Sequence, residues 1–305
     1  MDNNSSIMRS HWLLPILIAC NPGATLDPDE WLPGGDTTNT RMLGANAFLL
    51  PAQNLTPENE LAFFGGNGFF NQGWVEAPAS TDARDGLGPY FNARSCSGCH
   101  FRDGKAAPPV DGTGPFVGLL LRLSVPGEDG PIPHPIYGNQ LQDQANPGVP
   151  PEAVLEIEWI NEAGEYDDGT EYSLISPKIS FTEPAFGDMP EDLMFSPRIA
   201  PHMVGLGLLE AIPEKRLKEL EDPDDIDGDG ISGRIQWLSI DEGTIGRFGW
   251  KGDSPDVEQQ SAEAFAGDIG LTSTLQPYDD CTEAQNCDEE MSGGFPEVSD
   301  LIMER

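Results

Sequence analysis

Apolar residues follow a helical spacing towards the two ends of this chain and a strand spacing in its middle. Thr56-Pro57, followed by acidic and then apolar residues over 58–64, is the pattern of a capped helix. The run 116–125 is almost continuously apolar, while residues 155–160 and 172–181 alternate apolar with polar. The pattern therefore predicts a helix from about residue 57, and three or four strands between about residues 115 and 185.

Three further short helices are predicted after the strands, over about residues 204–211, 213–220 and 257–266. The chain also contains 35 glycines and 28 prolines, which indicate long irregular connections between short elements. We therefore expect a mainly α-helical protein with much irregular loop and a β insertion.

Composition and charge restrict the partners of the protein. Of 305 residues, 38% are hydrophobic, which is enough for a folded core. The 16 basic and 52 acidic residues give a net charge of −36, which repels phosphate backbones and excludes nucleic acid as a partner. Such a surface could attract a basic redox protein, although solubility or a salty habitat is the simpler explanation.

The N-terminus has the pattern of an export signal. Arg9 precedes a short apolar run over 12–19, which is too short to span a bilayer as a helix. The tetrapeptide 17–20 resembles the lipobox of bacterial lipoproteins, in which Cys20 would be lipidated; an ordinary cleaved signal is the alternative. We expect an exported protein of the periplasm or cell envelope, held at the outer membrane only by a lipid anchor, with residues 21–44 as a flexible tether.

The strongest motif is C-x-x-C-H, which occurs once, over residues 96–100. Its spacing lets two thiols reach the two vinyl groups of a haem while the adjacent histidine reaches the iron. A zinc site would need a second ligand pair, and a thioredoxin-like dithiol would need a βαβ context. We therefore predict one covalent haem c on Cys96 and Cys99, with His100 as axial ligand, in a cytochrome c-like region over residues 45–125.

The surroundings of this haem are less determined. A carbonyl of Pro108 or Pro109 could accept a hydrogen bond from His100, and a turn is the alternative. The aromatic residues Phe69, Phe70 and Trp74 could cover the porphyrin or simply fill the core. The sixth iron ligand could be His134, His202 or Met203, and an open site suited to peroxide is a further alternative.

Two polar features follow later in the chain. Asp225, Asp227 and Asp229 alternate and precede a glycine, as in loops that bind Ca²⁺, although Gln236 stands where a closing glutamate would fall. The alternative is a solvated acidic turn. Cys281 and Cys287 are expected to form a small disulfide in an oxidising compartment, with free thiols as the other possibility.

Several runs of residues together resemble the di-haem oxidoreductase family, a group of peroxidase-like proteins distantly similar to bacterial cytochrome c peroxidase. These runs are Gly86-Leu87-Gly88-Pro89-Tyr90-Phe91-Asn92-Ala93-Arg94-Ser95, Ser196-Pro197-Arg198-Ile199-Ala200-Pro201, 205–212, 227–234 and 246–251. The resemblance covers nearly everything from about residue 40 onward. It implies a haem-dependent oxidoreductase of the di-haem peroxidase type. The hydrophobic periodicity described above places a β-rich insertion over 126–195 and a second helical region over 196–305.

The family carries a second C-x-x-C-H that these 305 residues lack, so the chain resembles the N-terminal portion of a longer or split protein. By the cytochrome c peroxidase analogy, the haem on His100 would meet peroxide. Electrons would come from a small redox protein or a second haem-bearing chain. Two alternatives remain: a non-enzymatic mono-haem electron carrier, and a haem-binding fragment that needs a partner chain.

Peroxide cleavage needs a group that moves a proton and a charge that stabilises the departing oxygen. Glu210 and Arg198 are the candidates for these two roles, and each could instead be a buried structural or surface residue. Trp250 could relay electrons towards a second haem or be a core aromatic.

Overall fold

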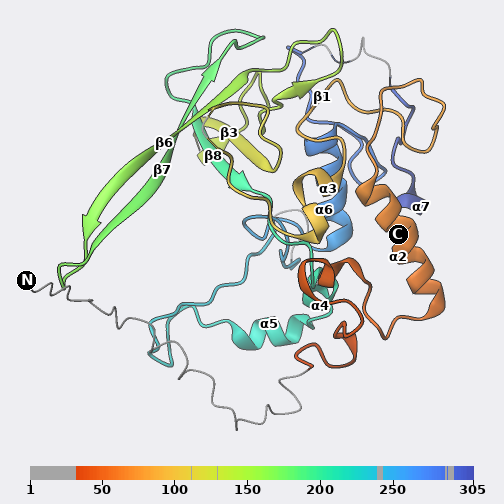
Figure 1. The fold of residues 1–305 in the computed structure, drawn as a ribbon, viewed down its shortest axis with the longest axis vertical. Helices are drawn as coiled ribbons and strands as arrows, with labels where there is room; N and C mark the ends of the chain where they lie inside the picture. Colours follow the sequence, from red (N-terminus) through yellow and green to blue (C-terminus); the bar gives the residue numbers. More distant parts are fainter. Residues whose placement is uncertain (1–31, 111, 129, 239–242, 286, 288–291) are drawn as a thin grey trace, which may run out of the picture.

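A computed structural model describes residues 32–110, 112–128, 130–238, 243–285, 287 and 292–305 (Figure 1). The predicted signal over 1–20, with its Cys20, and the first part of the tether lie outside these residues. Across the part of the chain that is described, no helix has the length and apolar character needed to cross a bilayer. In chain order the first short 3₁₀ turns are η1 (Gly35–Thr37) and η2 (Gly44–Leu49).

The expectation of a mainly α-helical fold is wrong. The structure is 23% helical and 23% strand, with three small antiparallel sheets. One helix, α2, is long, at 15 residues, and the others are short. The error has a physical cause. Strands of two or three residues are too short to show a period of two, and a strand whose partner is distant in the sequence has no neighbouring turn to mark it.

The first sheet orders its strands β4 (Gly130–Ile132), β3 (Leu119–Gly127) and β8 (Met194–Ile199). β3 is the predicted apolar run, and its residues Leu119, Leu121 and Leu123 are buried. They form one core with Tyr137, Leu141, Ala153, Leu155 and Ile157. Because side chains alternate between faces, Arg122 and the paired Leu120 and Arg198 lie on the opposite face.

The second sheet orders its strands β2 (Gly112–Thr113), β6 (Val154–Glu165) and β7 (Glu171–Thr182). β6 and β7 form one long hairpin that confirms the predicted strands and extends away from the body as an arm (Figure 1). The base of the arm is buried at Leu155 and Ile157, whereas Leu174 and Ile175 further out are exposed. Only the base therefore contributes to the core.

The helical part is organised around a second core. α2 (Pro57–Asn71) begins as predicted, because the Thr56 hydroxyl accepts the Asn59 N–H at 3.3 Å. The C-terminal α7 (Asp300–Met303) lies beside α2 (Figure 1). The second core comprises Trp74, Leu87, Phe91, Ile269, Leu271 and Val298, with Cys96 packed against it.

One close backbone contact joins distant parts of this core. β1 (Tyr90–Phe91) pairs with β5 (Gln144–Ala145), and the segment just before β1 crosses Gly270. A Cβ added to Gly88 would lie 2.6 Å from the Gly270 carbonyl oxygen and 2.7 Å from its Cα. Gly270 itself has a φ of 73°. Both positions therefore require glycine.

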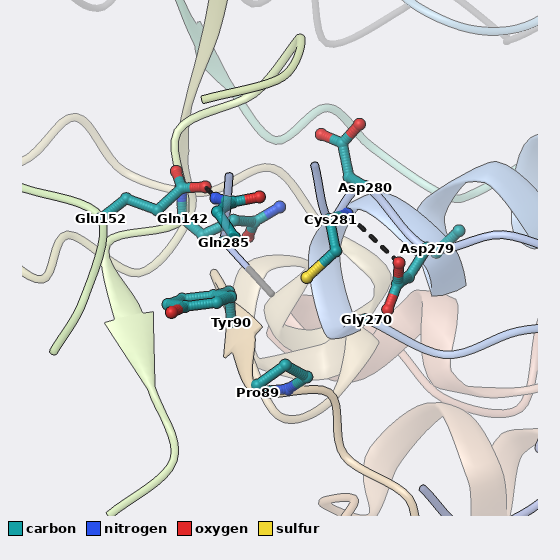
Figure 2. Close-up of a pocket in the computed structure, with 10 residues that line it drawn as sticks. Pro89, Tyr90, Gln142, Glu152, Gly270, Asp279, Asp280, Cys281 and Gln285 are labelled. Carbon is teal, nitrogen blue, oxygen red and sulfur yellow. Dashed lines mark hydrogen bonds between the residues drawn. The ribbon is translucent and has the colours of Figure 1, made fainter. Parts of the chain in front are cut away.

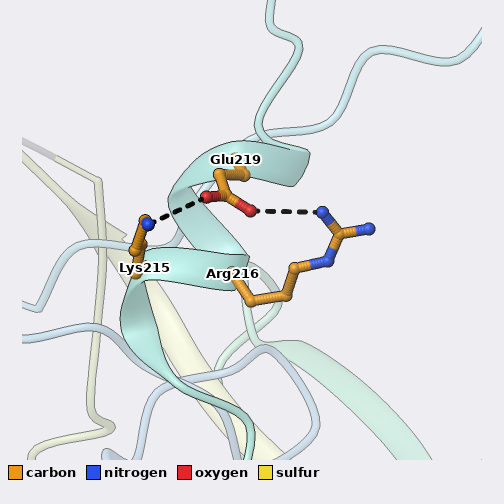
Figure 3. Close-up of polar contacts among 3 residues, drawn as sticks. All are labelled: Lys215, Arg216 and Glu219. Carbon is orange, nitrogen blue, oxygen red and sulfur yellow. Dashed lines mark hydrogen bonds and ion pairs between the residues drawn. The ribbon is translucent and has the colours of Figure 1, made fainter.

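The remaining helices are short. They are α3 (Cys96–Cys99), η3 (Phe101–Asp103), α4 (Leu206–Glu210), α5 (Glu214–Leu220), α6 (Val257–Ala264) and the π-turn η4 (Phe265–Ile269). The helices predicted over 204–211, 213–220 and 257–266 are confirmed in position. In α5, Glu219 pairs with Lys215 at 3.7 Å and with Arg216 at 3.3 Å on the exposed surface (Figure 3). Such exposed pairs contribute little stability.

Candidate haem site

The C-x-x-C-H residues occupy one turn of backbone. α3 carries both cysteines, and its C-cap is His100, whose N–H donates to the Cys96 carbonyl at 2.9 Å. The imidazole of His100 is oriented by the backbone of a distant segment: Nδ1 lies 2.7 Å from the Pro201 carbonyl oxygen. A carbonyl only accepts hydrogen bonds, so Nδ1 is the protonated nitrogen and Nε2 keeps its lone pair for a metal.

The acceptor expected at Pro108 or Pro109 is therefore wrong. The Pro109 carbonyl accepts the indole N–H of Trp159 at 2.9 Å instead. No local pattern could identify Pro201 as the acceptor, because it follows His100 by 101 residues. Only the folding of β8 against β3 brings the two together.

Backbone hydrogen bonds join segment 200–203 to the residues around the motif. The Ala106 N–H donates to the Ala200 carbonyl at 3.0 Å, and the Met203 N–H donates to the Asp103 carbonyl at 2.9 Å. Ala200 also donates to the Gly118 carbonyl at 3.0 Å. The end of β8 thus holds the residues on both sides of His100 in place.

The two thiols are partly buried and poorly suited to thiolate chemistry. Burial raises the pKa of the Cys96 thiol to about 12 and that of the Cys99 thiol to about 11, and the negative charge of Asp268 adds to both shifts. Reactive dithiols have lowered pKa values instead. These raised pKa values therefore disfavour the thioredoxin-like alternative.

Apolar side chains adjoin the motif. Phe101 and Val117 are 67% and 53% exposed, although both are large and hydrophobic. Val117 lies against Gly98, and the Phe70 ring centroid is 6.4 Å from that of His100. Phe69 and Trp74, the other predicted porphyrin contacts, belong to the second core instead. With two thiols on one turn and an imidazole whose Nε2 is available, these residues fit a covalently bound haem.

A polar network that the sequence did not reveal lies behind the motif. The Gln140 amide N–H groups donate to Asp268 Oδ1 at 2.7 Å and to Asn92 Oδ1 at 2.7 Å, and its oxygen accepts from Arg122 at 2.8 Å. The Asp268 carbonyl in turn accepts the N–H groups of Asn92 and Ala93, just before α3. Burial raises the pKa of the Asp268 carboxyl, while Gln140, Arg122 and His100 lower it.

One signal could have located this network. Asp268 is the single charged residue in the otherwise apolar or glycine stretch 264–271. A charged residue in such a stretch is costly to bury without partners, so its presence indicates a hydrogen-bonded site. Nothing in the local sequence identifies Gln140 or Arg122 as its neighbours.

The proposed distal ligands occupy other surroundings. His134 is 4% exposed, and its Nδ1 accepts the N–H groups of Ile136 and Tyr137, both at 3.1 Å, within a turn of the β-rich region. Burial lowers the pKa of His134. His202 and Met203 directly follow Pro201, whose carbonyl oxygen contacts His100 Nδ1, and the Met203 N–H donates to the Asp103 carbonyl. The hydrogen bonds of His134 give it a structural role, and ligation by His202 or Met203 stays a prediction.

The two catalytic candidates differ in their surroundings. Arg198 lies with its guanidinium carbon 5.9 Å from the centroid of the Trp250 ring, and its Nε is buried without a hydrogen-bond partner among the described residues. Burial and the charge of Arg122 lower its pKa. Glu210 is exposed, and its Oε1 accepts the Val257 N–H at 2.9 Å, at the start of α6. Glu210 thus has a structural partner, whereas Arg198 has an unused donor.

The acidic loop and the cysteine pair lie apart from the motif in sequence. Carboxylate oxygens of Asp222, Asp225 and Asp227 lie within 4.8 Å of one another, so Asp222 takes the place that Asp229 was expected to fill. Asp229 instead accepts the Ile231 N–H at 2.8 Å. Cys281 and Cys287 form a disulfide.

Comparisons with known proteins agree with the site. The profile of a family described as "Di-haem oxidoreductase, putative peroxidase" matches residues 30–118 and 185–293. Separate searches of curated proteins and of solved structures found no significant match. The matched segments cover most of the chain and include the C-x-x-C-H motif, the Pro201 carbonyl and Asp268. This chain therefore belongs to the di-haem oxidoreductase family.

Proposed function

We propose that this protein is a c-type cytochrome that takes part in peroxidase-type one-electron redox chemistry. Cys96 and Cys99 would hold one haem covalently, and His100 Nε2 would bind its iron. The observation that carries the proposal is the 2.7 Å contact of His100 Nδ1 with the Pro201 carbonyl, which leaves Nε2 free to bind a metal. When bound, haem supplies the one-electron redox centre and a position at which peroxide can react.

The protein supplies orientation and charge. The Pro201 carbonyl fixes the ring plane and tautomer of His100 and makes the imidazole a stronger donor. Arg198 presents a buried N–H without a partner, which suits a group that stabilises negative charge on a departing oxygen. The network of Asp268, Gln140 and Arg122 holds the backbone before α3, so it positions the motif without contacting a substrate.

The first experiment is spectroscopy of the haem-matured protein. We expect a covalent haem on the denatured polypeptide, and a high-spin ferric spectrum that changes when peroxide is added. The variants Cys96→Ala and Cys99→Ala should each lose a thioether bond. A purely low-spin haem that ignores peroxide in both oxidation states would contradict the peroxidase proposal and favour the mono-haem electron carrier.

The electron supply is a separate proposal. The family is di-haem, whereas these 305 residues contain one C-x-x-C-H, so a second haem would have to come from outside them. We propose a small redox protein or a second haem-bearing chain as donor, in the periplasm or cell envelope, with Cys20 as a lipid anchor. Membrane fractionation of the wild-type protein and Cys20→Ala tests the anchor: release of the variant alone is expected, and equal release of both would contradict it.

Calcium in the acidic loop is proposed on the convergence of Asp222, Asp225 and Asp227. Carboxylate oxygens are ligands that Ca²⁺ prefers. We expect Asp227→Asn to weaken calcium binding in titration calorimetry, whereas Asp229→Asn should change it little. Equal effects of the two variants would contradict this ligand set.

A further inference from the structure

A second polar site lies in a small cavity between the β-rich region and the C-terminal loop (Figure 2). The cavity has a volume of about 10 Å³, the space of one water-sized particle. Glu152 and Gln142 line it from one side, and Asp279 and Asp280 line it from the other, with Tyr90 below them in the view of Figure 2. None of these residues contributes to the haem proposal.

The walls of the cavity carry oxygen atoms that lack donors. Gln142 is 4% exposed, and its Oε1 has no hydrogen-bond partner among the described residues, although its amide nitrogen donates to Gly267 at 2.6 Å. Asp280 Oδ2 is likewise buried without a partner. A buried oxygen without a donor is energetically unfavourable, so two at one cavity indicate a missing positive or donating group.

Glu152 adds a carboxylate that is almost completely buried, at 1% exposure. Its Oε2 accepts the Gln142 N–H at 2.5 Å, and its Oε1 accepts from the Gln285 amide. Within the described residues, neither Glu152 nor Asp280 forms an ion pair with a lysine or arginine, and the nearby Arg122 bonds to Gln140 instead. Two carboxylates thus line one small space, and neither has an ion-pair partner among the described residues.

The titration behaviour agrees with this geometry. Burial raises the pKa of Glu152 to about 8 and that of Asp280 to about 7. The negative charge of Asp280 further raises the pKa of Glu152, and the charges of Asp279 and Asp268 further raise that of Asp280, whereas Arg122 lowers it. A cation in the cavity would relieve both effects at once.

We propose that Glu152, Asp280 and the Gln142 amide oxygen form a buried site for one calcium ion. Calcium is preferred to magnesium because the donors are carboxylates and an amide carbonyl in an irregular arrangement, whereas magnesium demands near-ideal octahedral geometry and keeps several waters. The ion joins the loop after β5 to the disulfide loop at Cys281, so its role is structural. This site is distinct from the Asp222–Asp227 loop and does not depend on the redox proposal.

The test counts calcium bound to the haem-matured full chain after chelation and dialysis, by equilibrium dialysis and elemental analysis. The loop variant Asp227→Asn serves as background, so that the cavity is measured alone. In that background we expect one calcium per chain, and its loss in both Glu152→Gln and Asp280→Asn. Glu162→Gln, at an exposed carboxylate on β6, is the matched control and should retain the ion.

The thermal unfolding midpoint gives a second readout. Calcium should raise the midpoint of the background protein and of Glu162→Gln, and leave that of Glu152→Gln and Asp280→Asn unchanged. Circular dichroism without calcium establishes whether each variant is folded. If Glu152→Gln is unfolded, Asp280→Asn, at the less buried position, tests the site alone. Absence of bound calcium in the Asp227→Asn background, or equal binding by Glu152→Gln, would overturn the proposal in favour of a buried water.

Discussion

The imidazole of His100 is oriented by a main-chain atom. A backbone carbonyl, here that of Pro201, has no side chain to lose, so substitution at position 201 leaves the acceptor in place. A substitution can still displace this carbonyl if it disturbs the backbone hydrogen bonds of Ala200 and Met203, which hold the segment in place. The residues that affect His100 are therefore those that fix this segment, not those that resemble a second ligand.

Substitutions at Arg198 and at Glu210 should have different effects, one on the reaction rate and the other on stability. Arg198→Gln removes a buried charged donor, and we expect the rate of the peroxide-induced spectral change to fall by about 10²-fold. Glu210→Ala removes the acceptor of the Val257 N–H and should cost about 1 kcal/mol of stability with little effect on that rate. Stopped-flow absorbance and urea unfolding measure the two. A large rate loss in Glu210→Ala with unchanged stability would reverse the assignment.

Two glycines give a paired prediction. In Gly88→Ala the new methyl would overlap the Gly270 backbone, so we expect a loss of about 1–3 kcal/mol or more. In Gly207→Ala the methyl enters open space on α4, and helix propensity predicts a gain of up to about 1 kcal/mol. Denaturant unfolding of both variants tests the contrast. Similar effects would mean that the Gly88–Gly270 contact is not tight in solution.

At the scale of elements, β8 connects the two cores. It pairs with β3 over the register Leu119↔Ile199 to Ser124↔Met194, and its end carries the segment that holds His100. The β6–β7 arm has the opposite character, since its outer half has exposed residues and little core contact. The family profile also omits residues 119–184, in which the arm lies. That segment also contains β3, so burial is what distinguishes the two: β3 has buried leucines, whereas the outer part of the arm is exposed. We therefore expect the protein to tolerate loss of the outer arm better than loss of the β3–β8 pairing.

Shortening the arm tests this division. Replacing residues 161–175 by Asn-Gly would join Ile160 to Ser176, which are paired across the hairpin, through a two-residue turn. Because the removed side chains are largely exposed, we expect a folded protein with an unchanged haem spectrum and a thermal midpoint within a few degrees. Loss of folding or of haem incorporation would show that the outer arm contributes to the body.

At the scale of the whole molecule, negative charge dominates. The net charge of −36 opposes compaction. Three of the acidic residues, Glu152, Asp268 and Asp280, lie inside the protein. These carboxyl groups all have raised pKa values because they are buried. Through these groups, lowering the pH should increase the stability of the fold, whereas it decreases the stability of proteins whose carboxylates form ion pairs.

The pH dependence follows from the sign of these shifts. Glu152 binds its proton more tightly in the folded state, with a pKa near 8 instead of 4.5, so its favourable contribution is complete below 4.5 and lost as pH rises through about 8. Asp280 acts in the same direction, up to about 7. In calcium-free buffer, stability should therefore fall between these limits. Urea unfolding across this range measures it, and Glu152→Gln should flatten the curve; an unchanged slope would contradict the assignment.

The sequence was sufficient for features that depend on neighbouring residues. The capped start of α2 at Thr56, the alternation of β6 and β7, and the thiol spacing of α3 each lie within one short window. It failed where partners are distant: the mainly α-helical expectation missed β8, and the Pro109 expectation missed Pro201. In the acidic loop, Asp225 and Asp227 converge with Asp222, which the alternating pattern did not include, and Asp229 is outside this group.

By itself, the sequence determined the family and predicted a covalently bound haem, because thiol and imidazole spacing is a property of consecutive residues. The tertiary structure alone decided the tautomer of His100, the network around Asp268 and the cavity at Glu152. Each of these depends on atoms separated by many residues along the chain. Such contacts leave no local pattern, because they arise only when sheets and loops bury polar groups that must then find partners.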